Sequence, residues 1–297
     1  MKNIRAQYMQ WAKQHPRARW DLCGSDLLPC TLDDLPEAAA AVQLNGPNDD
    51  GYAPLVEAIA RRHGVGAGQV ATGTGTSGVN FLVCAALLDA GDEVLVETPG
   101  YDPLFAAPEL LGARVVRFPR RFEDAYALDP DLVARGLTDR TRLIIITNLH
   151  NPSGVRASDD ALAAVGRLAE RVGAYVLVDE VYLDSSFAGP RFSDPRTLGP
   201  SDLRPSASLS DRFISTSSLT KSYGLAGLRC GWALAAPDVA ERVRRARDIV
   251  DGTGVFPGER MSVVAFEHLD RLAARALSIL EPNFALVRSF LDSCRDL

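Results

Sequence analysis

The sequence has few of the residues that build disulfide frameworks or metal centres. Its five cysteines are an odd number, and no two of them form a CxxC pair. Free thiols in a reducing cytoplasm are the expected state of such a set, so we predict a cytoplasmic location. Histidine occurs only four times, and no group of His, Cys and carboxylate residues has the spacing of metal ligands. We therefore expect no metal site.

Long apolar runs and an excess of basic residues are also missing. The longest strongly apolar stretch, Phe81–Leu88, is far shorter than the roughly 20 residues that span a bilayer. The N-terminus carries no apolar core of a signal peptide. A net charge of -6 argues against a nucleic-acid surface and against a basic membrane patch. We therefore expect neither nucleic acid nor membrane as a partner.

The 297 residues are enough for one large domain and part of a second. Apolar segments of strand length alternate with segments of helical periodicity, which predicts an α/β fold with a mostly parallel central sheet covered by helices on both faces. Strands are expected at 93–97, 114–118, 142–147, 175–179, 213–216 and 232–235, and helices at 75–88 and 162–172. In such sheets, ligands bind beyond the carboxyl ends of the strands.

Three regions are expected along the chain. Residues 1–45 form a polar arm punctuated by proline, which we expect to belong partly to a small domain. Residues 46–250 contain the predicted sheet. Residues 251–297 are mostly helical, as the start of that small domain, and Pro282 is expected to break or kink the helix there.

Lys221 lies in the run SerLeuThrLysSerTyrGlyLeuAlaGlyLeuArg, positions 218–229. An aldehyde cofactor would give this lysine a chemical role, because an imine titrates differently from a free ammonium. Ser218 and Arg229 on either side suit a phosphate held nearby. We interpret this stretch as a cofactor anchor.

A glycine-rich turn at 71–79 contains Gly75, Thr76 and Ser77 before a predicted helix. Glycines at this position let backbone N–H groups approach an anion, which the helix dipole also favours. An ordinary helix cap is the alternative. The pattern is not GxGxxG and no Walker lysine follows, so a nucleotide site is disfavoured.

Polar side chains follow several other predicted strands. Asn151 precedes a proline after the strand at 142–147, and Asp179 and Tyr182 follow the strand at 175–179. Asp179 suits a protonated ring nitrogen, and Tyr101 suits stacking on a flat ring. A plain turn, a structural ion pair and a loop aromatic are the alternatives. His150 attracts interest as a general base, but a lysine freed from its imine can move the proton itself.

Together these motifs resemble the class I/II aminotransferases, the fold-type I enzymes that use pyridoxal 5'-phosphate (PLP). The likeness covers about residues 45–250, in the family's own order: GlyThrSer before a helix, an aromatic after ThrPro, AsnProSerGly, AspGluValTyr, and SerLeuThrLys followed by GlyLeuArgCysGly. The resemblance implies an aminotransferase that moves an amino group from an amino acid to a 2-oxo acid, working as a homodimer.

The resemblance also implies roles for single residues. Lys221 matches the Schiff-base lysine, and Asp179 the partner of the pyridine nitrogen. Tyr182 and Asn151 match the donors to the ring's phenolic oxygen. Tyr101 matches the stacking aromatic. The phosphate site corresponds to Gly75, Thr76, Ser77, Ser218 and Arg229, and Gly24 matches a glycine beside the substrate carboxylate.

Two departures from the family pattern stand out. The stretch before Gly51 lacks the tyrosine that reaches a neighbouring subunit's phosphate, and Asn48 is the candidate substitute. No residue matches the arginine that grips the substrate carboxylate. A β-lyase, a decarboxylase, a lyase of the aminocyclopropane-carboxylate synthase type and a catalytically impaired PLP-binding fragment therefore stay as alternatives. A loss of the adjoining domain would leave Val263, Phe266 and Leu269 uncovered.

Overall fold

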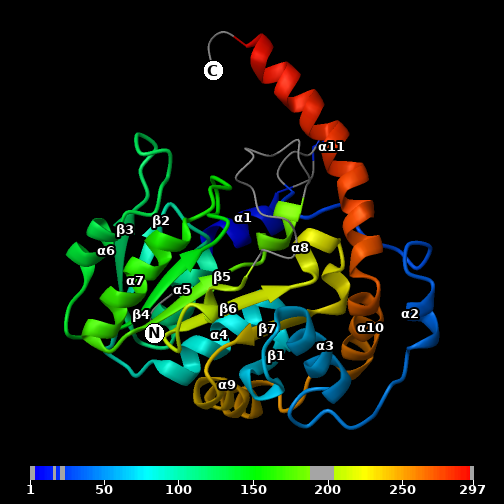
Figure 1. Cartoon of the computed structure of the whole chain (residues 1–297), viewed down its shortest axis with the longest axis horizontal. Coiled ribbons are helices and arrows are strands. Elements are labelled where there is room, and N and C mark those ends of the chain that lie inside the picture. The colour runs from blue at the N-terminus through cyan, green and yellow to red at the C-terminus, as the bar shows by residue number, and fades with distance from the viewer. Residues whose placement is uncertain (1–3, 16–17, 21–23, 188–203, 295–297) are drawn as a thin grey trace.

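The computed structural model describes residues 4–15, 18–20, 24–187 and 204–294. In these residues, seven strands form one sheet in the order β1-β7-β6-β5-β4-β2-β3. Strands β2 to β6 pair in parallel, whereas β7 runs antiparallel to both β6 and β1. Helices cover both faces of the sheet (Figure 1). The prediction of a mostly parallel sheet in an α/β fold is confirmed.

The strands alternate with helices along most of the chain. The strands are β1 (Val70–Thr74), β2 (Glu93–Thr98), β3 (Arg114–Pro119), β4 (Thr141–Thr147), β5 (Tyr175–Asp179), β6 (Phe213–Ser218) and β7 (Cys230–Leu234). The helices are α1 (Gln7–Gln14), α2 (Glu37–Ala40), α3 (Ala53–His63), α4 (Gly75–Leu87), α5 (Asp102–Leu110), α6 (Pro130–Gly136), α7 (Asp159–Val172), α8 (Thr220–Tyr223), α9 (Pro237–Val250), α10 (Phe256–Glu267) and α11 (Leu269–Ser293).

Every predicted strand is present, and the one expected at 232–235 lies at Cys230–Leu234. The prediction of a turn over the whole of 71–79 is wrong in its first half, because Val70–Thr74 forms an edge strand against β7. One glycine and two threonines in this strand hide it from a prediction based on apolar runs.

Two apolar cores lie on opposite faces of the sheet. Leu143 and Ile145 of β4 pack with α4, α5 and α9, whereas Ile144 and Ile146 pack with α6 and α7. This alternation explains why β4 is apolar at successive positions. The helices end at local signals: Ser158 Oγ accepts from Ala161 N at 3.2 Å at the start of α7, and Gly173 in the left-handed region ends it.

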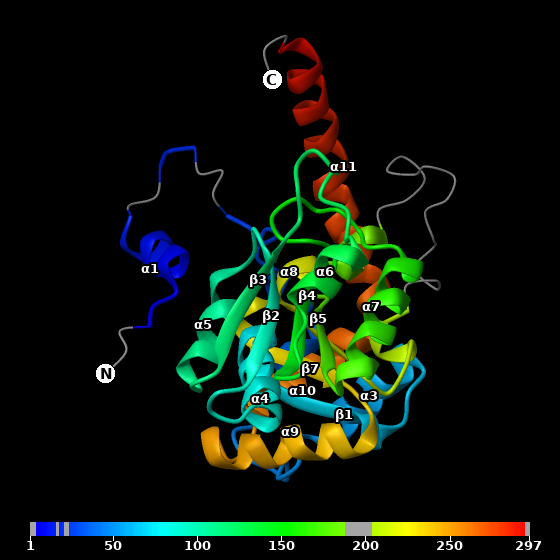
Figure 2. The ribbon, with the colours of Figure 1, turned by 90° about the vertical axis from the view of Figure 1, so that its left-hand side faces the viewer.

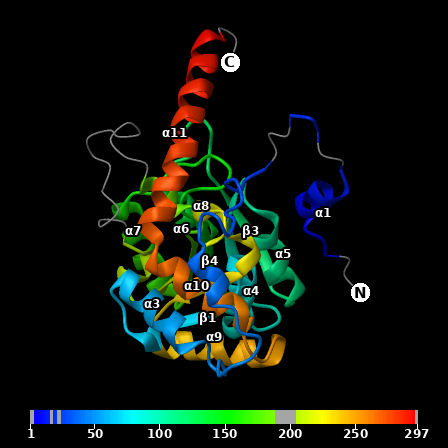
Figure 3. The same cartoon turned by 90° about the vertical axis from the view of Figure 1, so that its right-hand side faces the viewer.

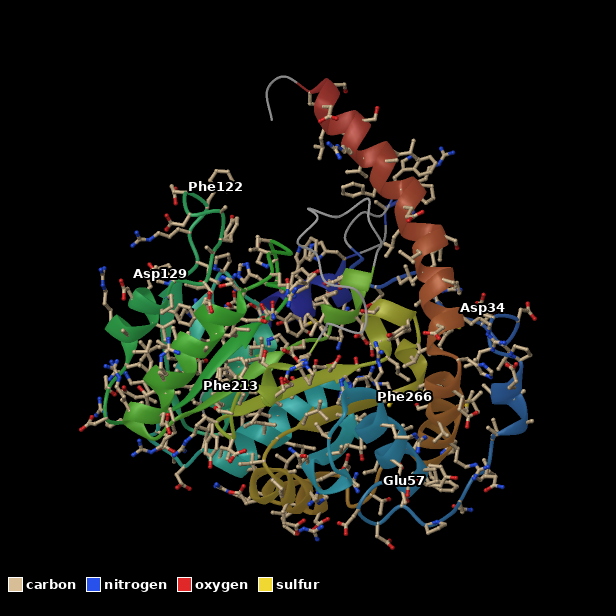
Figure 4. The ribbon with its side chains drawn as sticks, viewed as in Figure 1. Asp34, Glu57, Phe122, Asp129, Phe213 and Phe266 are labelled. Atoms are coloured by element: carbon tan, nitrogen blue, oxygen red, sulfur yellow. The ribbon has the colours of Figure 1, made fainter. Side chains whose placement is uncertain are left out.

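A third core joins the arm and the C-terminal helices to the sheet. Leu35 and Ala38 from the arm are buried there beside Trp232 of β7, with residues of α3 and α10. Phe266 lies on the side of α10 that faces the sheet and packs edge-on against Trp232 (Figure 4). The expectation that Val263, Phe266 and Leu269 are uncovered is therefore wrong, because all three pack against this core.

Helix α11 runs unbroken through Pro282, so the predicted break is absent. The interruption comes earlier, at His268 between α10 and α11. The outer part of α11 extends beyond the other elements (Figure 3) and exposes Leu286, Val287, Phe290 and Leu291. Within the described part of the chain, no helix has an apolar run long enough to cross a bilayer.

Helix α1 of the arm lies beside α5 (Figure 2), and Tyr8 N donates to the Asp102 carboxylate. The arm then returns to the edge of the sheet where Thr147, Asp179 and Ser218 end their strands. Polar residues from distant parts of the sequence meet at this edge.

Candidate active site

A cavity of about 660 Å³ opens at this edge of the sheet. It is lined by every predicted site residue except Gly75: Gly24, Thr76, Ser77, Tyr101, Asn151, Asp179, Tyr182, Ser218, Lys221 and Arg229. The sheet explains the convergence. The carboxyl ends of β1, β2, β4, β5 and β6 lie on one edge, and the reversed direction of β7 brings its beginning, next to Arg229, to the same edge.

Asp179 is the buried carboxylate of the site, 5% exposed at the end of β5. Its Oδ2 accepts from Asn80 Nδ2 at 2.8 Å, and its Oδ1 accepts from Val181 N at 3.1 Å. Burial raises the pKa of Asp179 to about 6, although these donors and Lys221 act in the opposite direction. The carboxylate is thus ionised at neutral pH but would gain from a cationic partner in the cavity.

Asn80 fixes the orientation of this carboxylate. It lies in α4, is 3% exposed, and its Oδ1 accepts from Thr216 Oγ1 at 2.6 Å. An amide that accepts from a hydroxyl and donates to a carboxylate has both ends satisfied. The chain Thr216–Asn80–Asp179 therefore holds the aspartate in one rotamer.

Lys221 lies in the short helix α8 immediately after β6. Its Nζ donates to Ser25 Oγ at 2.8 Å and forms an ion pair with Asp26. The ammonium also lies 6.0 Å from the centroid of the Tyr182 ring. Burial favours the neutral amine, but the Asp26 hydrogen bond and the Tyr182 phenol outweigh it, so the pKa of Lys221 is raised.

The residues predicted to hold a phosphate surround the start of α4. Arg229 adopts a left-handed backbone with φ 53°, and its guanidinium donates to Ala226 O at 3.1 Å and Thr74 O at 3.3 Å. Gly75 does not line the cavity but lies directly behind this guanidinium, where an added Cβ would come within 2.4 Å of Arg229 Nη2. Gly75 therefore makes room for Arg229.

Thr76 Oγ1 is buried, lines the cavity and has no hydrogen-bond partner among the described residues. A buried hydroxyl without a partner costs free energy unless a ligand or water supplies one. The beginning of α4, this hydroxyl and the guanidinium of Arg229 together form a site for an anion. The donor set therefore fits the phosphate group of PLP.

Two further predicted residues line the same cavity from separate loops. Tyr101 precedes α5, and its hydroxyl donates to Met9 Sδ at 3.4 Å. Burial raises the pKa of Tyr101, with Ser77 opposing the shift through a hydrogen bond. The backbone N–H of Asn151 donates to Thr147 Oγ1 at 2.8 Å, which fixes its loop to the end of β4.

His150 has a structural part in this loop. Its Nε2 faces Pro99 O at 3.0 Å and its Nδ1 faces Ser153 Oγ at 2.7 Å. A carbonyl only accepts, so Nε2 carries the proton and Nδ1 accepts from the serine. Burial lowers the pKa of His150 to about 4. Both ring nitrogens are engaged away from the cavity, so the ring is not positioned as a general base.

Several residues of the site were not predicted. Asn80 leaves a faint signal, because it interrupts an otherwise apolar face of α4. Ser25 and Asp26 meet Lys221 from 195 or more positions away in the sequence, a contact that no local pattern reports. Glu97 at the end of β2 accepts from Thr147 N at 2.6 Å and pairs with Arg120 at 3.0 Å, beneath the cavity.

Asn48 does not fill the role suggested for it. Its Nδ2 donates to Glu259 Oε2 at 2.9 Å and to Gly254 O at 3.0 Å, and the side chain is buried within the chain. Both amide hydrogens are therefore used internally. Among the described residues of the cavity wall, the cations are Lys221 and Arg229. In the described residues, no group of three or more His, Cys, Asp and Glu side chains is arranged so that it could hold a metal ion.

Comparisons with known proteins identify the family of the chain. The model of the family "Aminotransferase class I and II" matches residues 21–265. Capreomycidine synthase from Streptomyces vinaceus is 34% identical over 77% of this chain and 56% of its own length. A probable N-succinyldiaminopimelate aminotransferase from Mycobacterium tuberculosis is 31% identical over 83% of this chain and 62% of its own length. The chain thus spans about three fifths of these curated relatives.

A solved structure of an aminotransferase is also similar to this chain. The PLP-dependent aminotransferase from Streptococcus suis has a TM-score of 0.87 and 27% identity, covering 99% of this chain and 79% of that protein. The predicted resemblance is confirmed. The chain belongs to the class I and II aminotransferase family, whose members depend on pyridoxal phosphate.

Proposed function

We propose that this protein is an aminotransferase that uses PLP to move an amino group from an amino acid to a 2-oxo acid. The observation that carries the proposal is the meeting of Lys221 and Asp179 in one cavity beside an anion site. An amine, a buried carboxylate and an anion site match the aldehyde, the ring nitrogen and the phosphate of this cofactor. The family membership supports the same assignment.

When bound, PLP supplies an aldehyde that takes up an amine and a ring that withdraws electrons from the substrate's α-carbon. Lys221 is the residue for the covalent attachment. Thr76, Ser77, Ser218 and Arg229, with the N–H groups that begin α4, would hold the phosphate. Tyr101 would lie against the ring.

Asp179 keeps a proton on the ring nitrogen in this proposal. Its position is set by Asn80 and by Val181 N, so no side-chain rearrangement is needed to pair it with a cation. Tyr182 and Asn151 donate to the ring oxygen. Lys221, once displaced by the incoming amine, would take the proton from the substrate's α-carbon and deliver it to the carbon that carried the aldehyde.

The division of the chain follows from the same proposal. Residues 46–250 form the cofactor-binding domain, 1–45 the arm, and 251–297 the helical start of a small domain. All seven strands of the described sheet lie between Val70 and Leu234, which supports these limits. A homodimer is proposed because the family builds its sites at a subunit interface, and exposed Leu28 and Leu32 of the arm offer apolar surface for it. The odd number of cysteines, five, supports a cytoplasmic location in this proposal.

A different PLP reaction is the second candidate. One relative is a capreomycidine synthase, which by its name is not an aminotransferase. A β-lyase, a decarboxylase or another lyase would use the same lysine, aspartate and anion site. Mixing the protein with amino acids and 2-oxo acids separates the candidates. Exchange of the amino group supports the first, and release of ammonia with pyruvate, or of carbon dioxide, supports the second.

Two variants test the assigned residues. Lys221→Ala should retain weak binding of PLP but give no borohydride-trapped adduct at position 221. Asp179→Ala should still give the adduct, while turnover falls about 100-fold or more because a preorganised charge is lost. Peptide mapping after borohydride locates the adduct. An adduct on a different lysine in the unaltered protein would contradict the proposal.

A further inference from the structure

The amine of Lys221 is held by a segment of the arm, Gly24–Asp26. Nζ donates to Ser25 Oγ at 2.8 Å and to the Asp26 carboxylate. The lysine side chain is 23% exposed and that of Asp26 is 52% exposed. A charged hydrogen bond of this kind stabilises the ammonium over the neutral amine, although water weakens it on the aspartate side.

Contacts on both sides keep this arm segment beside α8. Cys30 N donates to Gly224 O at 2.9 Å, directly after the lysine helix. Gly224 has φ 70°, and an added Cβ there would lie 2.5 Å from Leu28 O. Arg275 of α11 donates to Leu28 O at 3.1 Å and to Pro29 O at 2.8 Å. The Asp26 contact is therefore set by the fold of the arm.

Other titratable and charged groups also line the cavity around Lys221, and the charged ones are engaged elsewhere. Asp179 accepts from Asn80 and Val181, and Arg229 donates to Ala226 O and Thr74 O. Asp102 accepts from Tyr8 N. In the described residues, the titratable and charged groups that line the cavity around Lys221 are Tyr8, Asp26, Tyr101, Asp102, Asp179, Tyr182 and Arg229. Asp26 is the carboxylate in direct contact with the amine.

We infer that Asp26 is a positioning residue that keeps Lys221 protonated before cofactor attachment and thereby sets the rate and pH range of that attachment. The inference rests on the proposed function. The carboxylate acts through the lysine and takes no part in later proton transfers at the substrate.

The chemistry of attachment requires the neutral amine. The ammonium first releases one proton to solvent. The nitrogen lone pair then attacks the aldehyde carbon, a C=N bond replaces the C=O bond, and the oxygen leaves as water with the two remaining hydrogens of the amine. Stabilisation of the ammonium by Asp26 lowers the fraction of Lys221 that can attack.

The variant Asp26→Asn keeps the size of the side chain and removes its charge. Because Asp26 is half exposed, its charge raises the pKa of Lys221 less than a buried carboxylate would. Attachment of PLP to the cofactor-free variant should therefore be about tenfold faster at pH 7 than in the unaltered protein. At each pH below the plateau, its rate should stay above that of the unaltered protein.

The measurement is the rise in visible absorbance after mixing cofactor-free protein with PLP, repeated from pH 6 to 10. Borohydride reduction and peptide mapping confirm that the adduct is at Lys221. Asp33→Asn is the matched control, because Asp33 lies on the same arm and is exposed, and removal of its charge should leave the profile unchanged. Ser25→Ala removes a neutral partner and should change the rate less than Asp26→Asn.

The outcomes separate this inference from the proposed function. If the unaltered protein takes up PLP at Lys221 but Asp26→Asn has the rate and pH profile of Asp33→Asn, the inference is wrong and the proposed function stands. If Ser25→Ala accelerates attachment as much as Asp26→Asn, charge is not the cause and the inference is also wrong. If no variant forms an adduct at Lys221, the proposed function itself fails.

Discussion

Removal of the Arg120 guanidinium should destabilise the protein more than almost any other single charge deletion. Arg120 Nη1 lies 3.0 Å from Glu97 Oε2, and the two side chains are 0% and 1% exposed. The pair therefore receives no screening from water. Breaking a buried pair by removing one partner costs about 3–5 kcal/mol, because the other charge is left uncompensated. We expect Arg120→Met to lower the free energy of unfolding by about 4 kcal/mol at pH 7.5.

The loss should depend on pH. Burial raises the pKa of Glu97, and Arg120 with the Thr147 donors partly offsets it. Without the arginine, the folded-state pKa rises further above its value in the unfolded chain. A carboxyl group with a raised folded-state pKa binds more protons when folded, so its destabilisation disappears below the unfolded pKa and grows as pH rises. Arg120→Met should therefore be closer to the unaltered protein at pH 5 than at pH 8.

A urea titration followed by circular dichroism measures both effects. Arg117→Met is the matched control, because Arg117 lies in β3 three residues before Arg120, is exposed, and stacks over the Phe105 ring. It should cost less than about 1 kcal/mol. The double variant Glu97→Gln with Arg120→Met removes both charges and retains an acceptor for Thr147, so it should recover much of the loss. Equal stability of Arg120→Met and Arg117→Met at pH 8 would refute the reasoning.

Two further predictions concern packing and protonation. Gly231→Ala should destabilise the protein by about 3 kcal/mol, because the added Cβ would lie 2.4 Å from the backbone of Gly75. Gly227→Ala is the control, since its added Cβ meets open space and should leave the stability unchanged. The urea midpoints of the two variants are compared. The neutral, buried His150 has a pKa of about 4 in the folded protein and 6.5 in the unfolded chain. Its contribution to the free energy of unfolding is therefore complete above pH 6.5 and is lost as pH falls toward 4, by about 3 kcal/mol in all. His150→Gln should therefore lose less stability between pH 7 and pH 4.5 than the unaltered protein, and an equal loss would count against a buried neutral ring.

Most of the sheet was accessible from the sequence because its strands are buried on both faces. The run LeuIleIleIle of β4 contributes to a core on each side, so apolar residues at successive positions marked it. Strand β1 gave no such signal. Its two threonines and one glycine pair with β7 at the edge, and the strand is fixed by that pairing and not by its own composition.

The residues of the candidate site were likewise only partly predictable from the sequence. Asp179, Lys221 and Arg229 were predicted because each follows or precedes a strand in a motif with a chemical reason. Asn80 and Asp26 were missed, since their importance comes from neighbours far along the chain. Pro282 shows the converse error: a proline removes one hydrogen bond from a helix, but a helix as long as α11 can continue past it.

The reversed direction of β7 has a mechanical consequence. Strands β6 and β7 are adjacent and antiparallel, so the chain leaves the sheet after Ser218 and re-enters it at Cys230 without crossing to the far edge. That single excursion carries both Lys221 and Arg229. A ligand bound by the amine of Lys221 at one end and by the guanidinium of Arg229 at the other would cross-link this loop. A shift in the position of either side chain would then also change the position of the other.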